Sequence, residues 1–349
     1  MPPLRSSPSL RDIAERAQVS RMTVSLALRN SSTISTATRS RIQGIARMLG
    51  HRPDPVISDL MAKLSKRSKA RHSVSIGLVT NQDGKRTIND SPTHQLYREG
   101  AISRADELGY NTEEFCLFAN QIGERRLCSI MYSRGIDIVV LFPLLDRGPK
   151  RSIKLDWGKF AIATCGYSLR QPTLHRSCFA HMRGIMEACR KVAELGYKRP
   201  ALVLDADQDR RSSHGWSGGF LAARKLANAK TSPLLHIPEV LTYSAFSSWF
   251  RRNRPDVLMH VGAEEQINDW ISRCGAKIPD DIGYVHLDLW PSMIGNISGI
   301  DQQSFQVGAA AIDLAAGAIR VNERGIPPHP KIISTDGVWR PGATTRLQE

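Results

Sequence analysis

The sequence predicts a small all-α N-terminal domain followed by an α/β core of two lobes, each a parallel sheet covered by helices. Three short helix patterns lie within residues 9–50, and each of them is opened by a capping side chain. From residue 74 onward, short apolar runs alternate with helical stretches, which is typical of parallel sheets with helices on both faces. A chain of 349 residues is too long for one ordinary core, so we expect the alternating part to form two lobes.

The N-terminal domain is expected to contain three helices. Ser9 and Asp12 form a capping-box pattern at the start of the first. Ser20 can cap a second helix that reaches about Arg29, and Ser35 can cap a third. Two helices joined by a short turn and packed on a third are the shape of a helix-turn-helix, whose second helix enters the major groove of DNA. The alternative is a basic three-helix module that binds another protein.

Positive charge is concentrated in the same part of the chain. The formal net charge is +15, and residues 1–72 contain fourteen Lys and Arg against four Asp and Glu. A cationic excess confined to the first fifth of a chain is expected where that segment meets a polyanion. The distribution therefore favours double-stranded DNA as a partner of the N-terminal domain.

One stretch of the sequence narrows the choice. It contains Leu10-Arg11-Asp12-Ile13-Ala14, Ala17, Val19-Ser20 and Thr23-Val24-Ser25. These residues resemble the opening signature of the lactose-repressor (LacI/GalR-type) family of bacterial transcriptional regulators. The resemblance implies a periplasmic-binding-protein-like core and a homodimer on operator DNA, and it leaves a tetramer open. It also implies a location in the bacterial cytoplasm at the nucleoid. The implied domains are residues 1–54 for DNA binding, 55–72 for a hinge helix and basic linker, and 73–349 for the core.

The resemblance also implies roles for side chains of the second helix. Three of them would touch phosphates or the groove wall, namely Ser20, Thr23 and Ser25, while Arg21 and Met22 would face base edges. Arg29, at the end of this helix, belongs to the same DNA-binding set. Leu26 stands where the family usually has a base-reading arginine, so we expect apolar contact with a thymine methyl there. Gln18 replaces a common turn glycine, at a cost of about 1 kcal/mol if its φ is positive.

The segment from Asp54 to Leu64 reads as a short helix with Asp54 as cap and Pro55 in its first turn. An isolated helix of this length is barely stable in water, so it would need DNA or a partner to fold. By its position, Leu60 resembles the family's leucine that wedges between base pairs in the minor groove and bends the site. The alternative is that Leu60 and its apolar neighbours simply pack on the core or on each other.

The core pattern supplies strands and helices for two sheets. We predict strands at residues 74–79, 136–141, 160–163, 201–204, 257–260 and 282–287, and helices at 94–108, 181–195, 215–229 and 263–274. The expected first lobe comprises about 73–173 and 297–326, and the second about 174–296 and 327–349. Family resemblance continues through the core, most clearly in Ile278-Pro279-Asp280-Asp281-Ile282 and the strand that ends at Asp288.

Two lobes joined by crossing strands leave a cleft at the carboxyl ends of their sheets, where ligands bind in such folds. Asp288, at the family's pocket position, would accept hydrogen bonds from a sugar or another hydroxylated effector. Trp216 stands where the family often has an arginine, and it could stack on the apolar face of a sugar. The remaining candidates are polar residues of nearby loops, which are more often solvated surface groups than ligand contacts; they are Arg210, Arg211, Asn81 and Asp83.

Other classes of function are disfavoured. The sequence has no nucleophile elbow, no zinc-protease motif and no phosphate loop, so we expect neither an enzyme nor a cofactor. Six cysteines without a C-x-x-C pair predict reduced thiols rather than a metal site. No secretory signal and no membrane-spanning run is present. We therefore expect a sequence-specific regulator, most simply a repressor, controlled by a small effector such as a sugar. The alternative is an architectural DNA-binding dimer whose effector pocket has degenerated.

Overall fold

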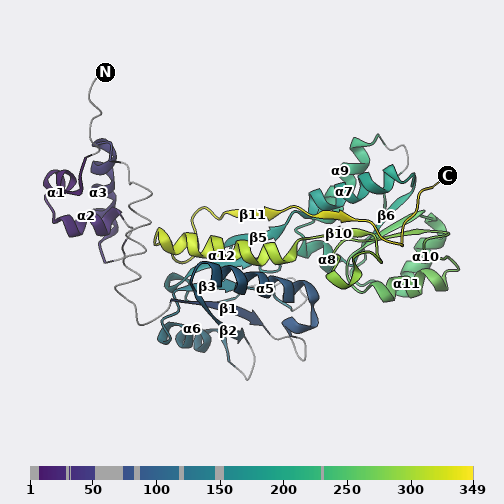
Figure 1. Cartoon of the computed structure of the whole chain (residues 1–349), viewed down its shortest axis with the longest axis horizontal. Coiled ribbons are helices and arrows are strands. Elements are labelled where there is room, and N and C mark those ends of the chain that lie inside the picture. The colour runs from purple at the N-terminus through teal and green to yellow at the C-terminus, as the bar shows by residue number, and fades with distance from the viewer. Residues whose placement is uncertain are drawn as a thin grey trace, which may run out of the picture.

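The computed structural model describes residues 8–28, 31, 33–51, 74–81, 87–117, 122–145, 153–228 and 232–348. Within these ranges the N-terminal helices form one group and the core divides into two sheets (Figure 1). The predicted hinge helix, with Leu60, lies outside the described residues, as do Arg29 and Asp83.

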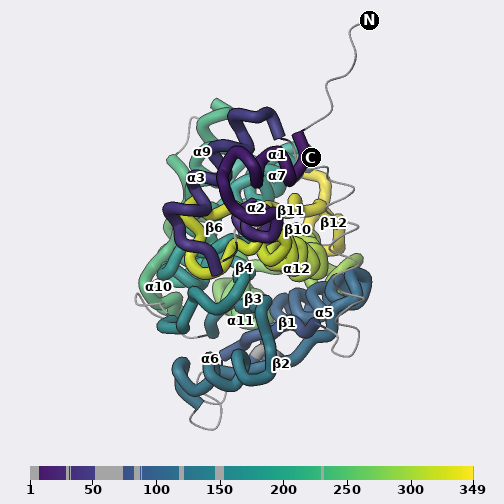
Figure 2. The backbone as a smooth tube through the Cα atoms, turned by 90° about the vertical axis from the view of Figure 1, so that its left-hand side faces the viewer, coloured from purple at the N-terminus to yellow at the C-terminus, as the bar shows by residue number. Residues whose placement is uncertain are grey.

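The N-terminal domain consists of α1 (Leu10–Ala17), α2 (Arg21–Leu28) and α3 (Thr36–Met48), which Figure 2 shows gathered around one another. The predicted capping box is present, because the backbone N–H of Asp12 donates to Ser9 Oγ and that of Ser9 donates to Asp12 Oδ2. Ser35 caps α3 as expected. A small apolar core holds the three helices together, made of Ile13, Ala14, Ala17, Val24, Ala27, Ile42 and Ala46.

Gln18 ends α1 in the left-handed conformation, with φ 53° and ψ 46°. The predicted cost at Gln18 depended on a positive φ, and the structure has one. A residue with a Cβ is strained there by about 1 kcal/mol relative to glycine.

The sheet of the first lobe has six parallel strands in the order β11-β5-β4-β3-β1-β2. The strands are β1 (Ser75–Asn81), β2 (Asn111–Leu117), β3 (Ile138–Leu141), β4 (Ala161–Cys165), β5 (His175–Phe179) and β11 (Ile332–Thr335). Helices α5 (Pro92–Glu107) and α12 (Ser304–Arg320) pack on one face, and α6 (Glu124–Ser133) packs on the other. Short 3-10 turns lie at η1 (Ile88–Asp90) and η3 (Trp157–Lys159).

Two glycines allow α5 and α12 to cross closely. A Cβ on Gly100 would lie 1.9 Å from the carbonyl oxygen of Phe305, and a Cβ on Gly308 would lie 1.9 Å from that of Tyr97. Only glycine permits backbones to approach so closely. This crossing fixes the N-terminal half of α5, which faces the second lobe.

The second sheet has the order β12-β10-β9-β8-β6-β7. Its strands are β6 (Pro200–Val203), β7 (Leu234–His236), β8 (Val257–His260), β9 (Gly283–His286), β10 (Gly299–Asp301) and β12 (Val338–Arg340). All neighbours are parallel except β12, which runs antiparallel to β10, so the expectation of a wholly parallel sheet needs correction at this edge. Helices α7 (His181–Glu194) and α9 (Gly215–Leu226) cover one face, and α10 (Tyr243–Asn253) and α11 (Glu264–Arg273) cover the other.

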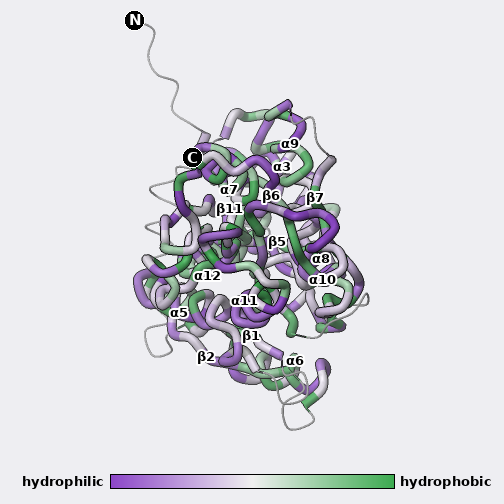
Figure 3. The backbone as a smooth tube through the Cα atoms, turned by 90° about the vertical axis from the view of Figure 1, so that its right-hand side faces the viewer, coloured by the Kyte–Doolittle hydropathy of each residue, from purple (hydrophilic) through white to green (hydrophobic). Residues whose placement is uncertain are grey.

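The chain passes between the lobes three times, after β5, after β10 and after β11. We therefore place the lobe boundaries near residues 180, 302 and 336, because β5 and β11 belong to the first sheet. Polar and apolar stretches alternate along the core helices (Figure 3), as expected where one face of each helix is buried on a sheet. The six cysteines are free thiols, three buried and three half-buried.

Candidate functional site

The start of α2 presents its side chains to solvent. Ser20 caps the helix by accepting a hydrogen bond of 3.0 Å from the backbone N–H of Thr23, and the two hydroxyls lie 2.8 Å apart. Arg21 and Met22 follow in the first turn and are exposed, Met22 to 72%. The apolar side chain of Met22 and the guanidinium of Arg21 therefore project into solvent from the N-terminal end of α2.

The remaining predicted residues of α2 lie at the edge of the domain core. Thr23, Ser25 and Leu26 are half-buried, whereas Val24 and Ala27 face inward and are fully buried. Part of the Leu26 side chain is therefore exposed, and it lines a cavity together with first-lobe residues such as Lys159. Arg21 through Leu26 therefore lie together on one short helix, and Ser20 caps its start.

Side chains from α3 hold the ends of the other two helices. Arg41 donates to the carbonyl oxygen of Ala17 at 3.0 Å, and Gln43 donates to that of Ala27 at 2.9 Å. These bonds satisfy carbonyls that a helix leaves unpaired at its C-terminus. They also fix the direction in which α2 projects from the domain.

A cavity of about 280 Å³ lies between the two lobes. The first lobe contributes the beginning of α5 and the segments that follow β3 and β4, and the second contributes α8 (Ala206–Arg211), the start of α9 and the segments that follow β8 and β9. The cavity is therefore at the carboxyl ends of the strands, as the sequence predicted for a ligand site in such a fold. Its residues include Asp90, Thr93, Tyr97, Tyr167, Asp207, Arg211, Trp216, Asp288 and Trp290.

Asp288 follows β9 and lines this cavity with only 9% of its surface exposed. Thr93 of the first lobe donates its hydroxyl to Asp288 Oδ2 at 2.6 Å, and the indole N–H of Trp290 donates to Thr93 Oγ1 at 3.2 Å. Burial raises the pKa of the Asp288 carboxyl to about 6, against smaller opposing effects of the Thr93 hydroxyl and the Trp290 indole N–H. The second oxygen, Oδ1, is buried and has no hydrogen-bond partner among the described residues.

Trp216 forms part of the cavity wall and is 2% exposed. Its ring meets His181 edge to face, with centroids 4.8 Å apart, and lies 5.7 Å from the ring of Phe179. Burial lowers the pKa of His181 to about 4, so this imidazole is neutral at pH 7. The wall around Trp216 is therefore aromatic and uncharged.

Of the two arginines predicted near the cleft, Arg211 lines the cavity and Arg210 does not. Arg211 lines the cavity and donates to the carbonyl oxygen of Leu144 at 2.9 Å, which joins the second lobe to the first. Arg210 lies outside the cavity lining, because its guanidinium turns to Glu239 at 3.1 Å.

Asn81 is also absent from the lining. It is buried and its Oδ1 accepts from the backbone N–H of Leu145 at 2.9 Å. Since Leu145 itself lines the cavity, Asn81 positions a wall segment rather than facing the space directly.

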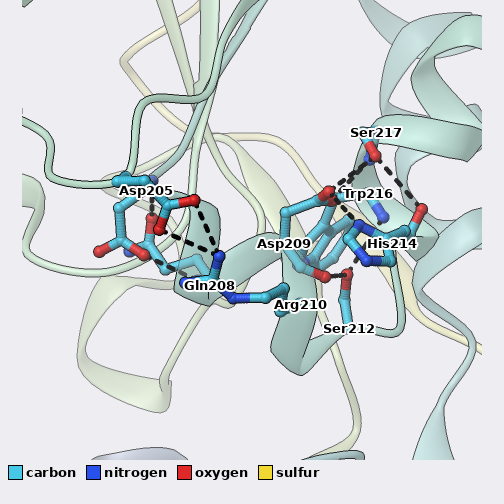
Figure 4. A network of polar contacts seen from close by, with 9 residues as sticks. Asp205, Gln208, Asp209, Arg210, Ser212, His214, Trp216 and Ser217 are labelled. Carbon is cyan, nitrogen blue, oxygen red and sulfur yellow. Dashed lines mark hydrogen bonds and ion pairs between the residues drawn. The ribbon is translucent and has the colours of Figure 1, made fainter. Parts of the chain in front are cut away.

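A buried carboxylate organises the turn between α8 and α9 (Figure 4). Asp209 accepts from the backbone N–H of Ser217 at 3.1 Å and from its hydroxyl at 2.8 Å, and its Oδ2 lies 2.8 Å from Nδ1 of His214. Ser213 and His214 have positive φ in this turn, a conformation that costs free energy unless side-chain contacts hold it. The network sets the direction from α8 to α9, and hence the places of Arg211 and Trp216.

Thr93, Trp290, Asp207 and Asp209 were not identified from the sequence. One local signal was available, because Asp205 and Gln208 form a capping box at the start of α8, and that pattern marks a helix beginning. It would have placed Asp207 in the first turn of a helix that follows a strand. Nothing in the sequence indicates that Thr93 approaches Asp288, since the two residues are 195 positions apart.

Within the ranges that the structure covers, no group of three or more His, Cys, Asp or Glu residues is placed to hold a metal ion. No helix in those same ranges is long and apolar enough to cross a membrane.

Known proteins resemble both the N-terminal domain and the core of this chain. Residues 9–54 match the model of "Bacterial regulatory proteins, lacI family". The HTH-type transcriptional repressor CytR of Escherichia coli (strain K12) is 38% identical over 320 residues, which cover 87% of each chain.

Solved structures show the same fold. The transcriptional regulator CelR in complex with cellobiose has a TM-score of 0.60 at 17% identity and covers 97% of this chain and 99% of its own. The lac repressor dimer bound to operator and an anti-inducer has a TM-score of 0.55 at 15% identity, covering 98% and 100%. A regulator from Enterococcus faecium with bound ribose has a TM-score of 0.57 at 13% identity, covering 79% and 100%.

Proposed function

The chain belongs to the lacI family of bacterial regulatory proteins, and from this we propose that it is a sequence-specific transcriptional repressor controlled by a small molecule bound between its lobes. The family consists of DNA-binding regulators, which agrees with the expectation that the chain is not an enzyme. The observation that carries the proposal is the combination of a family-matched α2 with exposed first-turn side chains and a cavity between the lobes at the strand ends.

We assign operator reading to α2. Arg21 and Met22 are the exposed side chains of its first turn, and Ser20, Thr23 and Ser25 are the hydroxyls beside them. Hydroxyls and helix N-termini bind phosphates, whereas long side chains reach base edges. Leu26 adds an apolar contact suited to a thymine methyl, and Arg29 and Leu60 are proposed DNA contacts from the sequence alone.

The proposed assembly is a homodimer that binds a pseudo-palindromic operator. Two recognition helices would occupy successive major grooves, and the pair of hinge segments would enter the minor groove between them. The lac repressor dimer on its operator supports this arrangement as a structural neighbour. Such a protein acts in the bacterial cytoplasm, at the nucleoid.

The effector site is the cavity between the lobes. Its volume of about 280 Å³ suits a monosaccharide-sized molecule, and the neighbours with bound cellobiose and ribose support a carbohydrate or a related metabolite. The proposed contacts from the second lobe are Asp288, Trp216 and Arg211. A cavity between the lobes that is lined by a carboxylate with an unpaired buried oxygen favours a working site over a degenerate one.

Three hydrogen bonds between described residues join the lobes beside this cavity: Thr93 to Asp288, Trp290 to Thr93, and Arg211 to Leu144. A ligand hydroxyl that bonds Asp288 competes with Thr93 for the carboxylate. Occupancy therefore changes how the lobes are held together, and through them the spacing of the two N-terminal domains in a dimer. Operator and effector must alter each other's affinity by the same factor.

Selection of bound sequences from a random duplex pool tests the proposal. The full chain at physiological salt should recover an inverted repeat, and Arg21→Ala with Met22→Ala should change the half-site. Arg183→Ala removes an exposed cation from the core and serves as the matched control, with an unchanged repeat. Recovery of no common sequence would favour the architectural alternative instead.

A further inference from the structure

The charges around the cavity are unbalanced. Three carboxylates line it, from Asp90, Asp207 and Asp288, and Arg211 is the single Lys or Arg among its described lining residues. Arg211 already donates to a backbone carbonyl of the first lobe, and His181 is neutral at pH 7. The formally charged Asp, Lys and Arg side chains that line the space are therefore mostly negative, which disfavours an anionic ligand.

One of these carboxylates is incompletely bonded. Asp288 has one oxygen occupied by Thr93, while its Oδ1 is buried without a donor in the described part of the chain. A buried carboxylate oxygen left without a donor is costly, because it has lost its hydration and gained nothing in return. A ligand that places a donor against Oδ1 removes this cost.

The nature of the donor decides between two ligand classes. A neutral hydroxyl supplies one hydrogen bond to the carboxylate but brings no positive charge. An ammonium group supplies the hydrogen bond and, in addition, a positive charge that attracts the carboxylates. Trp290, half-buried beside Asp288 on the cavity wall, offers an aromatic ring of the kind that also attracts cations.

We propose that the cavity selects an amino sugar, with the ligand ammonium donating to Asp288 Oδ1 and its hydroxyls contacting the remaining carboxylates. This inference rests on the proposed function, since it names the chemical class of the effector for that cleft. It goes further because it requires a positive charge on the ligand.

The test measures binding of matched ligands to the full chain by calorimetry at about pH 7, where the Asp288 carboxylate is mostly ionised. Glucosamine is compared with glucose and with N-acetylglucosamine, which keeps the skeleton without the charge, and galactosamine is compared with galactose. We expect at least one amino sugar to bind about tenfold or more tightly than both uncharged counterparts. Glucuronate, which is anionic, should not bind.

Two variants locate the effect. Asp288→Asn should reduce affinity for the amino sugar about tenfold or more, while an uncharged sugar changes much less. Asp336→Asn is the control, because this carboxylate is exposed and pairs with Arg183 away from the cavity; it should leave both affinities unchanged.

Equal or tighter binding of the uncharged sugars would overturn the proposal, as would the failure of both amino sugars to bind. Every preparation is also assayed on the duplex recovered by selection. Specific operator binding by a chain that does not prefer amines would reject the inference while leaving the proposed function intact.

Discussion

Replacing Asp288 by asparagine should stabilise the ligand-free chain at neutral pH. Burial raises the pKa of this carboxyl from 3.8 to about 6, so ionisation is less favourable in the folded chain than in the unfolded one. A difference of about 2 pKa units corresponds to about 3 kcal/mol of stability lost above pH 6. Asparagine resembles the protonated acid and avoids that loss.

The sign and the pH window follow from the same pKa. Because the folded value lies above the unfolded one, the native state binds the proton more tightly, and stability falls as pH rises from 3.8 to about 6. The advantage of Asp288→Asn should therefore be about 3 kcal/mol at pH 7.5 and about 1 kcal/mol at pH 4.5. An amide N–H left without an acceptor at the Oδ1 position would reduce both values.

Scanning calorimetry of the ligand-free protein measures the effect. At pH 7.5 the Tm of the variant should exceed that of the parent by roughly 2–8 °C, and the difference should shrink at pH 4.5. Asp336→Asn, at an exposed carboxylate, should shift Tm little at either pH. A Tm for Asp288→Asn that is lower than that of the parent at pH 7.5, or a gain that does not depend on pH, would refute the reasoning.

Three further changes test other parts of the account. Gln18→Gly should stabilise the N-terminal domain by about 1 kcal/mol, because the residue has a φ of 53°; denaturant unfolding would contradict this if the variant were no more stable. Thr93→Val removes the donor to Asp288 and the acceptor for Trp290, so thermal unfolding should show a loss of about 1–3 kcal/mol, and an unchanged Tm would argue against the inter-lobe bond. Leu60→Ala should weaken specific DNA binding and reduce bending while the salt slope stays nearly constant; unchanged affinity and bending would remove the wedge role.

Helix starts in the N-terminal domain were predictable because their signals are local. Ser9 and Ser35 bond backbone groups three residues away, so the pattern is complete within a few positions. The same is true of β8, whose apolar run the structure places at the predicted residues. Elements of this kind depend little on the rest of the chain.

Strand β5 shows why other elements were missed. Its sequence is polar for a buried strand, since Arg176 and Ser177 are both buried. Arg176 donates to the carbonyl oxygens of Gly166 and Leu169, and Ser177 donates to that of Val307. These partners come from elsewhere in the fold, so no apolar pattern marks the strand, and the expected lobe boundary fell before it.

In the candidate site too, some residues could be predicted from the sequence and others could not. Family resemblance led to Asp288 and Trp216, both of which line the cavity. The role of Thr93 could not be predicted from the sequence, because it depends on how the two lobes close on each other. Arg210 and Arg211 are neighbours in sequence, yet successive helical side chains point in different directions, and only the structure shows that Arg211 is the one at the cavity.

The most direct test of the central claim is the ratio of two affinities, for the selected duplex and for a scrambled duplex of the same composition, measured at physiological salt. A sequence-specific regulator should bind the selected duplex about a thousandfold or more tightly. A ratio near one, with binding that simply falls as salt rises, would show that the positive N-terminal domain reads only phosphates and would contradict the assignment.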